Sequence, residues 1–262
     1  MGTHVKGIFV CFGLINMLRA AFGLLLMLGC LVCAAAPLQM ERFVARFVLK
    51  SFGTTVGRSE WRLIPIEGQQ FLWESRSETA GAGAFIRDVY ITERSESELI
   101  GQSFRPLVYH YDRYGKNVTR NVKVAFDWEN GVALNTAKGH TWRIAVASGT
   151  LDKLNYLLAL MSDLSDGKRS MRYTIADGGR VKVYDMHADG IEILETALGT
   201  LKTVKIQRLR DGDYGEATLW CASALGFLPV KLERRNREGR LVTMYIEAIE
   251  GTPPTVMKKP GG

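Results

Sequence analysis

Residues 43–49 read Phe-Val-Ala-Arg-Phe-Val-Leu. The odd-numbered positions from Phe43 to Leu49 are all apolar, and in an extended chain they fall on one face. This alternation is typical of a β-strand with one buried face. The stretch therefore predicts a strand, and similar patterns recur along the chain.

Glycine-containing turn signals divide the chain into strand-length segments rich in Val, Ile, Thr, Tyr, Phe and Trp. Such a succession predicts consecutive β-hairpins. Two of the segments, 181–187 and 241–249, have apolar side chains on both faces, so we expect them to be covered on both sides or to face a cavity. The turn signals are Glu67-Gly68, Tyr114-Gly115, Asn130-Gly131, Asp177-Gly178-Gly179, Asp189-Gly190, Asp211-Gly212 and Glu238-Gly239.

One segment departs from the strand pattern. Between Thr150 and Leu164 apolar residues recur with helical spacing, which predicts an amphipathic helix. Thr150 and Asp152 suit its N-terminus, where the Asp152 charge interacts favourably with the helix dipole. Gly167 suits its end. The apolar stripe packs against the inner face of the sheet or covers a cavity as a lid. The residues expected to line that cavity or lid are Leu154, Leu157, Leu158 and Met161.

These patterns predict a mainly all-β fold: a curved antiparallel sheet or open β-barrel with one central amphipathic helix. We assign a single β-rich domain to residues 37–250, since no Pro-rich or Ser-rich linker interrupts 41–249. The tail 251–262 contains Pro253-Pro254 and Lys258-Lys259 and is predicted to be disordered.

Residues 1–36 have the anatomy of a signal peptide. Arg19 supplies a positive charge, the stretch 20–33 is apolar but short for a membrane span, and residues 34–36 are alanines suited to cleavage. Met17 is an alternative start to Met1. We therefore expect export to the periplasm, with peripheral or no membrane association after cleavage. Two alternatives stay open: acylation of Cys30, which makes a lipoprotein, and an uncleaved anchor.

The composition is that of a folded globular protein, with 47% apolar and 23% charged residues in 262. Without residues 1–36 the chain has 32 Lys and Arg against 27 Asp and Glu, and both signs alternate along the predicted strands. A nucleic-acid-binding protein would cluster its cations, so no nucleic-acid partner is expected.

No constellation of residues predicts a catalytic, cofactor-binding or metal site. His110, His140 and His187 are far apart and lack metal-ligand spacing. Glu192 and Glu195 would face opposite sides of a strand, which argues against a paired-carboxylate site. Cys221 is the one cysteine outside the leader, and we interpret it as a small buried apolar residue. The tryptophans fill a core or line a cavity for an acyl chain or sugar; they are Trp61, Trp73, Trp128, Trp142 and Trp220.

Several short motifs occur in a characteristic order. They are Ser103-Phe104-Arg105-Pro106-Leu107 with Tyr109 and Tyr111, Phe126-Asp127-Trp128, Leu151-Asp152-Lys153-Leu154, Glu195-Thr196-Ala197-Leu198-Gly199-Thr200, Thr218-Leu219-Trp220-Cys221-Ala222 and Leu228-Pro229-Val230-Lys231-Leu232. Over residues 41–249 this series resembles the bacterial periplasmic family named domain of unknown function 3108. The resemblance implies a periplasmic location, a curved antiparallel β-structure and no assigned chemistry. The motif residues that we expect to be structural are Arg105, Pro106, Asp127, Trp128, Asp152, Gly199, Trp220 and Pro229.

Three functions remain open from the sequence. The first is non-enzymatic binding of a lipid-like or envelope-polymer ligand in the curved sheet, by loose analogy with periplasmic lipoprotein carriers, which are half-barrels with a helix across the opening. The alternative is a protein–protein interaction module in envelope maintenance, using an exposed strand edge. The third is a hydrolase. No cofactor is expected for any of them.

Overall fold

The computed structural model describes residues 41–81, 84, 88–115, 119–208, 216–235 and 239–253. The predicted signal peptide, Cys30 and tail residues 254–262 lie outside them. The strands are β1 (Phe43–Ser51), β2 (Thr54–Pro65), β3 (Gln70–Thr79), β4 (Val89–Ile100), β5 (Ser103–Gly115), β6 (Arg120–Asp127), β7 (Val132–Ala137), β8 (His140–Ala145), β9 (Ser170–Asp177), β10 (Arg180–Thr196), β11 (Gly199–Arg208), β12 (Ala217–Ala222), β13 (Leu228–Arg235) and β14 (Leu241–Gly251). The helix α3 spans Asn155–Ser165, and a 3₁₀ turn, η1, spans Ser223–Leu225.

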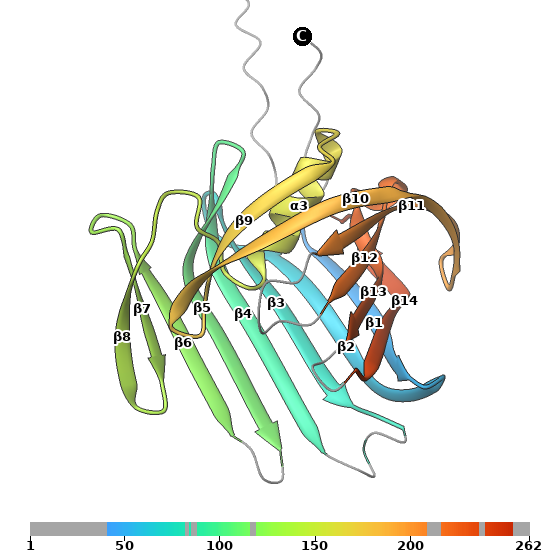
Figure 1. The fold of residues 1–262 in the computed structure, drawn as a ribbon, viewed down its shortest axis with the longest axis horizontal. Coiled ribbons are helices and arrows are strands. Elements are labelled where there is room, and N and C mark those ends of the chain that lie inside the picture. Colours follow the sequence, from blue (N-terminus) through green and yellow to red (C-terminus); the bar gives the residue numbers. More distant parts are fainter. Residues whose placement is uncertain are drawn as a thin grey trace, which may run out of the picture. The chain divides into compact units, whose positions relative to one another are not determined.

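All fourteen strands belong to one antiparallel sheet, in the order β8-β7-β6-β5-β4-β3-β2-β1-β14-β13-β12-β11-β10-β9. The first and last strands of the described residues, β1 and β14, are therefore neighbours in the middle of the sheet. The chain passes from one edge of the sheet, β8, to the other, β9, through α3 (Figure 1). Strand β14 runs to Gly251, one residue past the predicted boundary.

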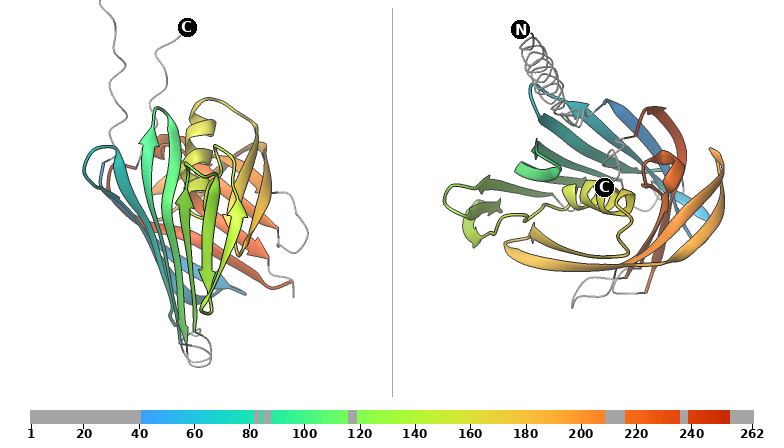
Figure 2. Two further views of the ribbon diagram at one scale, coloured as in Figure 1. Left: turned by 90° about the vertical axis from the view of Figure 1, so that its left-hand side faces the viewer. Right: turned by 90° about the horizontal axis from the view of Figure 1, so that it is seen from above.

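The sheet curls around α3 into a nearly closed, barrel-like structure. Seen from above, strands flank the helix on several sides (Figure 2). The predicted fold class, a curved antiparallel sheet or open barrel with one central helix, is confirmed. The period-two and helical patterns suffice for this outcome because each states which face of its segment must be buried.

The inner face of the sheet and α3 share one hydrophobic core. Aromatic rings fill its centre: Phe47 lies 4.7 Å from Trp61, and Trp61 lies 5.8 Å from Trp73, between ring centroids. Phe47 and Trp73 are almost completely buried. The interior is therefore packed with side chains around the helix, as protein cores generally are.

Helix α3 begins five residues after the predicted start at Thr150, and its end matches the expected stop signal. Gly167 has φ +79°, a left-handed conformation that favours glycine. Its N–H donates to Leu164 O at 3.0 Å, and the next N–H, of Lys168, donates to Asp163 O at 2.9 Å. This pair of bonds is a Schellman motif, which satisfies the last carbonyls of the helix.

Two sequence expectations are wrong. The Asp189-Gly190 signal is not a turn: it is a β-bulge inside β10, between Ala188 and Ile191, with Gly190 at φ +105°. A bulge and a turn both use a glycine with positive φ, so this signal alone does not separate them. The strands with two apolar faces are covered on one face only, because Val181 and Tyr245 are more than a third exposed while Met186 and Ile246 are buried.

Candidate functional site

The start of α3 is organised by Asp152. Its Oδ1 accepts the backbone N–H groups of Leu154 at 2.7 Å and Asn155 at 2.9 Å. Leu154 is the N-cap residue of α3 and makes no side-chain cap bond, so Asp152, two residues earlier, satisfies amide groups that have no partner within the helix. Asp152 thus acts through its side-chain oxygen as well as through its charge near the helix dipole.

Three polar residues of β4, spaced two apart on one face, bind this helix start. Ser95 Oγ donates to Asp152 Oδ2 at 2.5 Å, and Asn155 Nδ2 donates to Ser97 Oγ at 2.6 Å. Lys153 Nζ lies 3.2 Å from Glu93 Oε1. We call this set the clasp; it comprises Glu93, Ser95, Ser97, Asp152, Lys153 and Asn155.

Burial sets the electrostatics of the clasp. Asp152 is fully buried, and desolvation raises its pKa to about 6, although Ser95 and the two amides partly offset the shift. The Tyr109 hydroxyl donates to Glu93, and burial holds the pKa of Tyr109 well above its usual value. For Lys153, burial lowers the pKa, but Glu93 and Asp177 outweigh it, so the pKa lies above its ordinary value.

The residue before Asp152, Leu151, binds the edge strand β9 on the opposite side of the sheet. Leu151 N donates to Thr174 O at 2.8 Å, and Ala176 N donates to Leu151 O at 2.9 Å. These two bonds form a short parallel bridge that pairs part of the outer edge of β9. The segment leading into α3 therefore connects β4 to β9 across the barrel.

The four helix residues predicted to line a cavity or lid lie in the common core. Each is at most 4% exposed; they are Leu154, Leu157, Leu158 and Met161. Their stripe contacts core side chains of the sheet, which is the arrangement that stabilises an isolated helix best.

The motif residues of β5 and β6 fix strands and turns. Trp128 Nε1 donates to Pro106 O at 2.8 Å, and its ring stacks on Phe126 at 5.2 Å. Asp127 accepts the backbone N–H of Asn130 at 3.1 Å, which holds the turn before β7. Arg105 forms an ion pair with Glu98 at 2.6 Å across β4 and β5.

The motif residues nearer the C-terminus have comparable roles. Trp220 Nε1 donates to Glu192 at 2.6 Å, and Lys231 Nζ lies 3.9 Å from the centroid of the Trp220 ring. Gly199, at φ +99°, follows the β10–β11 turn. Pro229 is buried opposite Cys221, where the β12–β13 register shifts. Cys221 is itself fully buried, and burial raises the pKa of its thiol well above the usual range.

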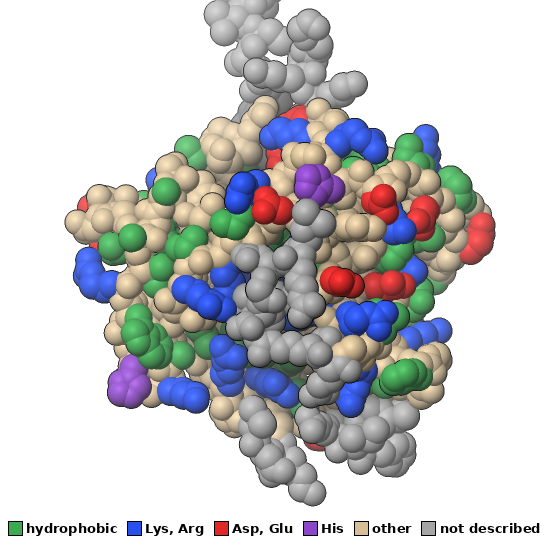
Figure 3. Space-filling view, viewed as in Figure 1, with side chains coloured by type: hydrophobic (Ala, Val, Ile, Leu, Met, Phe, Trp, Pro, Cys, Tyr) green, Lys and Arg blue, Asp and Glu red, His purple; other side chains and the backbone are tan. Residues whose placement is uncertain are grey.

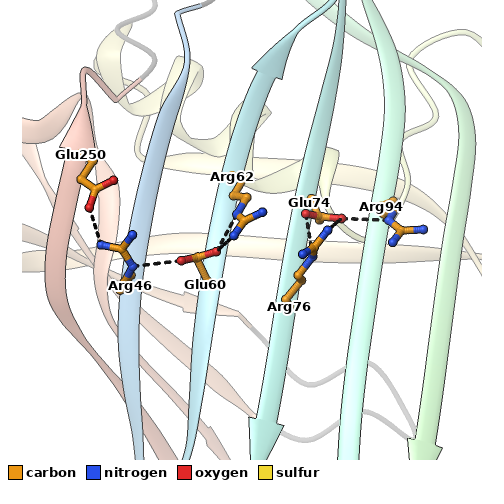
Figure 4. A network of polar contacts seen from close by, with 7 residues as sticks. All are labelled: Arg46, Glu60, Arg62, Glu74, Arg76, Arg94 and Glu250. Atoms are coloured by element: carbon orange, nitrogen blue, oxygen red, sulfur yellow. Dashed lines mark hydrogen bonds and ion pairs between the residues drawn. The ribbon is translucent and has the colours of Figure 1, made fainter.

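The outer face of β14 and β1–β4 carries a ladder of guanidinium and carboxylate groups, which the sequence analysis did not single out. Figure 4 shows these side chains on the face turned away from α3. Arg46 binds Glu250 at 2.6 Å and Glu60 at 2.9 Å, and Glu60 also binds Arg62. On the next two strands, Glu74 accepts from Arg76 at 2.9 Å and Arg94 at 2.8 Å.

A groove of about 410 Å³ lies beside this ladder. By strand register, its lining comprises two outward-facing rows on β1–β4 and, between them, a row of residues whose side chains belong to the inner face, such as the buried Phe47 and Ser59. This volume is in the range of small-ligand sites. The lining residues are Arg46, Phe47, Arg58, Ser59, Glu60, Arg76, Ser77, Glu78, Tyr90, Ile91, Thr92 and Glu247.

Signs of catalysis are weak in the part of the chain that the structure describes. The register of β9 and β10 brings Ser170 Oγ within 2.9 Å of His187 Nδ1, but both residues are exposed and no bond from a carboxylate to this ring is seen among the described residues. Those residues also contain no group of three or more His, Cys, Asp or Glu able to hold a metal. None of the helices found in them is long and apolar enough to cross a membrane.

Charge on the opposite side of the domain is mixed. On the face shown in Figure 3, acidic side chains lie among basic ones toward the upper right, whereas the charged side chains toward the lower left are basic. This agrees with the alternation of sign along the strands in the sequence.

Comparisons with known proteins give a family and a fold. A family model described as "Protein of unknown function (DUF3108)" matches residues 42–247. No curated protein matches the sequence. A β-barrel-like protein of domain of unknown function DUF1849 from Brucella abortus superposes with a TM-score of 0.54 at 9% identity, over 80% of this chain and 97% of that one. At that identity the likeness concerns the fold alone.

Two further solved structures have lower scores. One is a candidate exported protein with a YmcC-like fold from Bacteroides fragilis, with a TM-score of 0.33 at 12% identity, over 82% of this chain and 98% of that one. The other is a candidate lipoprotein from Parabacteroides distasonis, with a TM-score of 0.31 at 10% identity, over 82% of this chain and 97% of that one. Neither score supports an argument about this chain.

Proposed function

The chain belongs to the DUF3108 family of proteins of unknown function, and from this premise we propose that its β-rich domain is a non-enzymatic binding module of the bacterial cell envelope. Its ligand is an envelope polymer, and the ligand lies in the groove on the outer face of β1–β4. The observation that carries the proposal is the groove itself, a 410 Å³ depression lined by charged and hydroxyl-bearing residues.

The packed interior of the domain supports a binding site on the outer face of β1–β4. A carrier of lipid-like molecules would need an apolar cavity beneath the helix, whereas the helical stripe packs into the core with no residue more than 4% exposed among Leu154, Leu157, Leu158 and Met161. The groove has polar walls, which suit a polymer rich in hydroxyl or charged groups better than an acyl chain. Polymer binding is therefore the better supported of the two ligand classes.

Export is the other half of the proposal. It rests on Arg19, the apolar stretch 20–33 and the alanines at 34–36, all outside the described residues. A C-terminally tagged protein should fractionate with the periplasm after losing about 35 residues. A full-length cytosolic product would contradict export. Palmitate labelling that disappears in Cys30→Ser would show that the protein is a lipoprotein.

The binding test uses the exported protein and isolated envelope polymers, namely peptidoglycan sacculi and purified surface polysaccharide. We expect the wild-type protein to co-sediment with one of them. Thr92→Trp places a large side chain in the groove and should abolish co-sedimentation. Thr141→Trp, on exposed strand β8 outside the groove, is the matched control and should bind like wild type. Equal binding by all three proteins would overturn the groove as the site.

A second candidate function is protein docking at β8. This strand ends the sheet, whereas part of the opposite edge strand, β9, is paired by Leu151. An exposed strand edge can pair with an extended peptide from a partner. A photo-crosslinker at Thr141 that captures one defined envelope protein, with no product from the same group at Thr92, would favour this function over polymer binding.

A further inference from the structure

Resting on the groove as the binding site, we infer that its ligand is a neutral, hydroxyl-rich glycan that runs across the strands, with sugar rings stacked on exposed tyrosines. The inference comes from the strand register, which aligns residues distant in sequence along one outward-facing row. From β14 to β5 this row consists of Tyr245, Val48, Arg58, Glu78, Tyr90 and Tyr114.

The tyrosines of this row are open to solvent. Tyr90 is 50% exposed, Tyr114 is 48% exposed and Tyr245 is 38% exposed. Tyr90 and Tyr114 are direct cross-strand neighbours, and Tyr90 also lines the groove. An aromatic side chain offers a flat apolar face and a polar tip, a combination suited to the apolar face and hydroxyl rim of a sugar ring.

The spacing of the tyrosines suits an extended chain. Tyr245 and Tyr90 are separated by four strand intervals, which is about 19 Å at the usual distance between strands. The groove extends over the same strands, from Glu247 on β14 to Tyr90 on β4, so a linear ligand stacked on both tyrosines would follow it at right angles to the strands. Lys50 Nζ lies 5.7 Å and Lys231 Nζ 5.8 Å from the centroid of the Tyr245 ring, and these flexible side chains can move aside when a sugar ring stacks there.

The charge of the groove selects against a polyanion. Three guanidinium groups and three carboxylates line it, so the walls have no net charge. Arg46 and Arg76 are already bound by carboxylates. A phosphate-rich or uronate-rich polymer would therefore meet as much repulsion as attraction.

The same balance suits hydroxyl groups. Arg58 and Glu78 face each other across β2 and β3 without an ion pair between them, and no ion pair involves either among the described residues. Arg58 offers several N–H donors and Glu78 offers acceptors only. A pair of neighbouring sugar hydroxyls can satisfy both groups at once, whereas a phosphate can satisfy only Arg58.

The experiment measures calorimetric binding of neutral cello- and chito-oligosaccharides of four to six sugars, with polyphosphate and oligouronate of similar length as anionic probes. We expect a neutral oligosaccharide to bind, and to bind equally in 0.5 M NaCl, since the interaction involves little net charge. Tyr90→Ala should weaken binding roughly 3- to 10-fold, while Tyr90→Phe should retain it. Trp142→Ala, which removes a similarly exposed ring on β8, is the matched control and should bind like wild type.

Two outcomes separate this inference from the proposed function. Suppose that envelope polymer co-sediments and Thr92→Trp abolishes it, but the anionic probes bind, the neutral ones do not, and salt abolishes binding. The groove is then the site and the neutral-glycan inference is wrong. If no polymer co-sediments at all, the proposed function itself fails. Melting curves of the Tyr90 variants, expected to match wild type, show that any loss of binding is not loss of the fold.

Discussion

The clasp and the outer ladder each contain a buried carboxylate, but the two carboxylates have different partners. In the clasp, Asp152 is fully buried, with one hydroxyl and two amides as donors and no cation bonded to it in the part of the chain that the structure describes. Beside the groove, Glu74 is equally hidden, with side-chain exposure of 3%, yet two arginines bind it. Hydroxyl and amide donors fix position, whereas arginines also supply the opposite charge.

This difference in partners has opposite consequences for protonation. Burial raises the pKa of Asp152 to about 6, so ionisation of this carboxyl is less favourable in the folded protein than in water. On the outer ladder, the Arg46 guanidinium lowers the pKa of Glu250, so that charge is favoured. The clasp should therefore mainly affect the free energy of unfolding, whereas the ladder mainly sets the charge of the outer surface. Substitutions should separate the two regions accordingly, with large effects on folding inside and large effects on binding outside.

The largest effect is expected from Leu157→Ala. Leu157 is 4% exposed within the core, so its truncation removes buried methyl groups and leaves a cavity. We expect a loss of about 2–5 kcal/mol in the free energy of unfolding. Chemical denaturation measures it, with Thr141→Ala on β8 as the exposed control. A cost well below this range, together with lost ligand binding, would mean that the helix is a lid over a cavity.

The next effect concerns pH and Asp152. Its pKa in the folded protein, about 6, lies above the ordinary 3.8, so the folded protein keeps its proton to a higher pH than the unfolded chain does. The stability contribution is therefore fully present below about pH 4 and is lost as pH rises through 6, an overall loss of about 3 kcal/mol.

Asp152→Asn isolates this contribution. The asparagine side-chain oxygen can accept the same backbone N–H groups but the side chain does not ionise, so the unfolding free energy of the variant should lack this pH-dependent loss. The quantity to measure is the difference between wild type and variant at pH 4.5 and at pH 7. As pH rises, the wild type should lose unfolding free energy relative to the variant. A difference that stays constant would show that Asp152 ionises in the folded protein at its ordinary pKa.

A smaller effect is expected from Ser95→Ala. The substitution removes the hydroxyl donor from Asp152 Oδ2, leaving a buried carboxylate less satisfied. We expect a loss of about 1–3 kcal/mol at neutral pH. Ser77→Ala is a suitable control, because the Ser77 hydroxyl bonds to the uncharged Ser59 at 2.8 Å and to no charged group among the described residues. Equal costs for the two variants would show that the charge at Asp152 adds nothing to the hydroxyl's contribution.

Much of the fold could be predicted from the sequence because the relevant signals are local. The alternation from Phe43 to Leu49 and the stripe from Leu154 to Met161 each state which face is buried. Asp152 near the helix start was visible for the same reason. The Asp189-Gly190 bulge was not, because whether pairing continues past a glycine depends on the neighbouring strand.

The groove could not be predicted, because it depends on register between strands. The sequence shows Arg58, Glu60 and Arg62 alternating along one strand, but not that Arg46 and Arg76 lie on either side of Glu60. Likewise, Tyr90 and Tyr245 share a row only because β1 pairs with β14. The first and last of the described strands meet there, and a local pattern contains no information on a contact of that kind.

The smallest effect on stability, and the sharpest test of the contrast, comes from Arg58→Ala. Arg58 lines the groove and forms no ion pair among the described residues, so its removal should change the unfolding free energy by no more than about 0.5 kcal/mol. Polymer co-sedimentation should nevertheless fall, because the donors opposite Glu78 are lost. Arg94→Ala, on the ladder but outside the groove lining, is the matched control: it removes an arginine from Glu74 and should affect stability more than binding. If Arg94→Ala weakened binding as much as Arg58→Ala, the charge of the whole face rather than the groove would attract the ligand. If neither did, the outer face would be an ordinary solvated surface, and the functional contrast between the two regions would disappear.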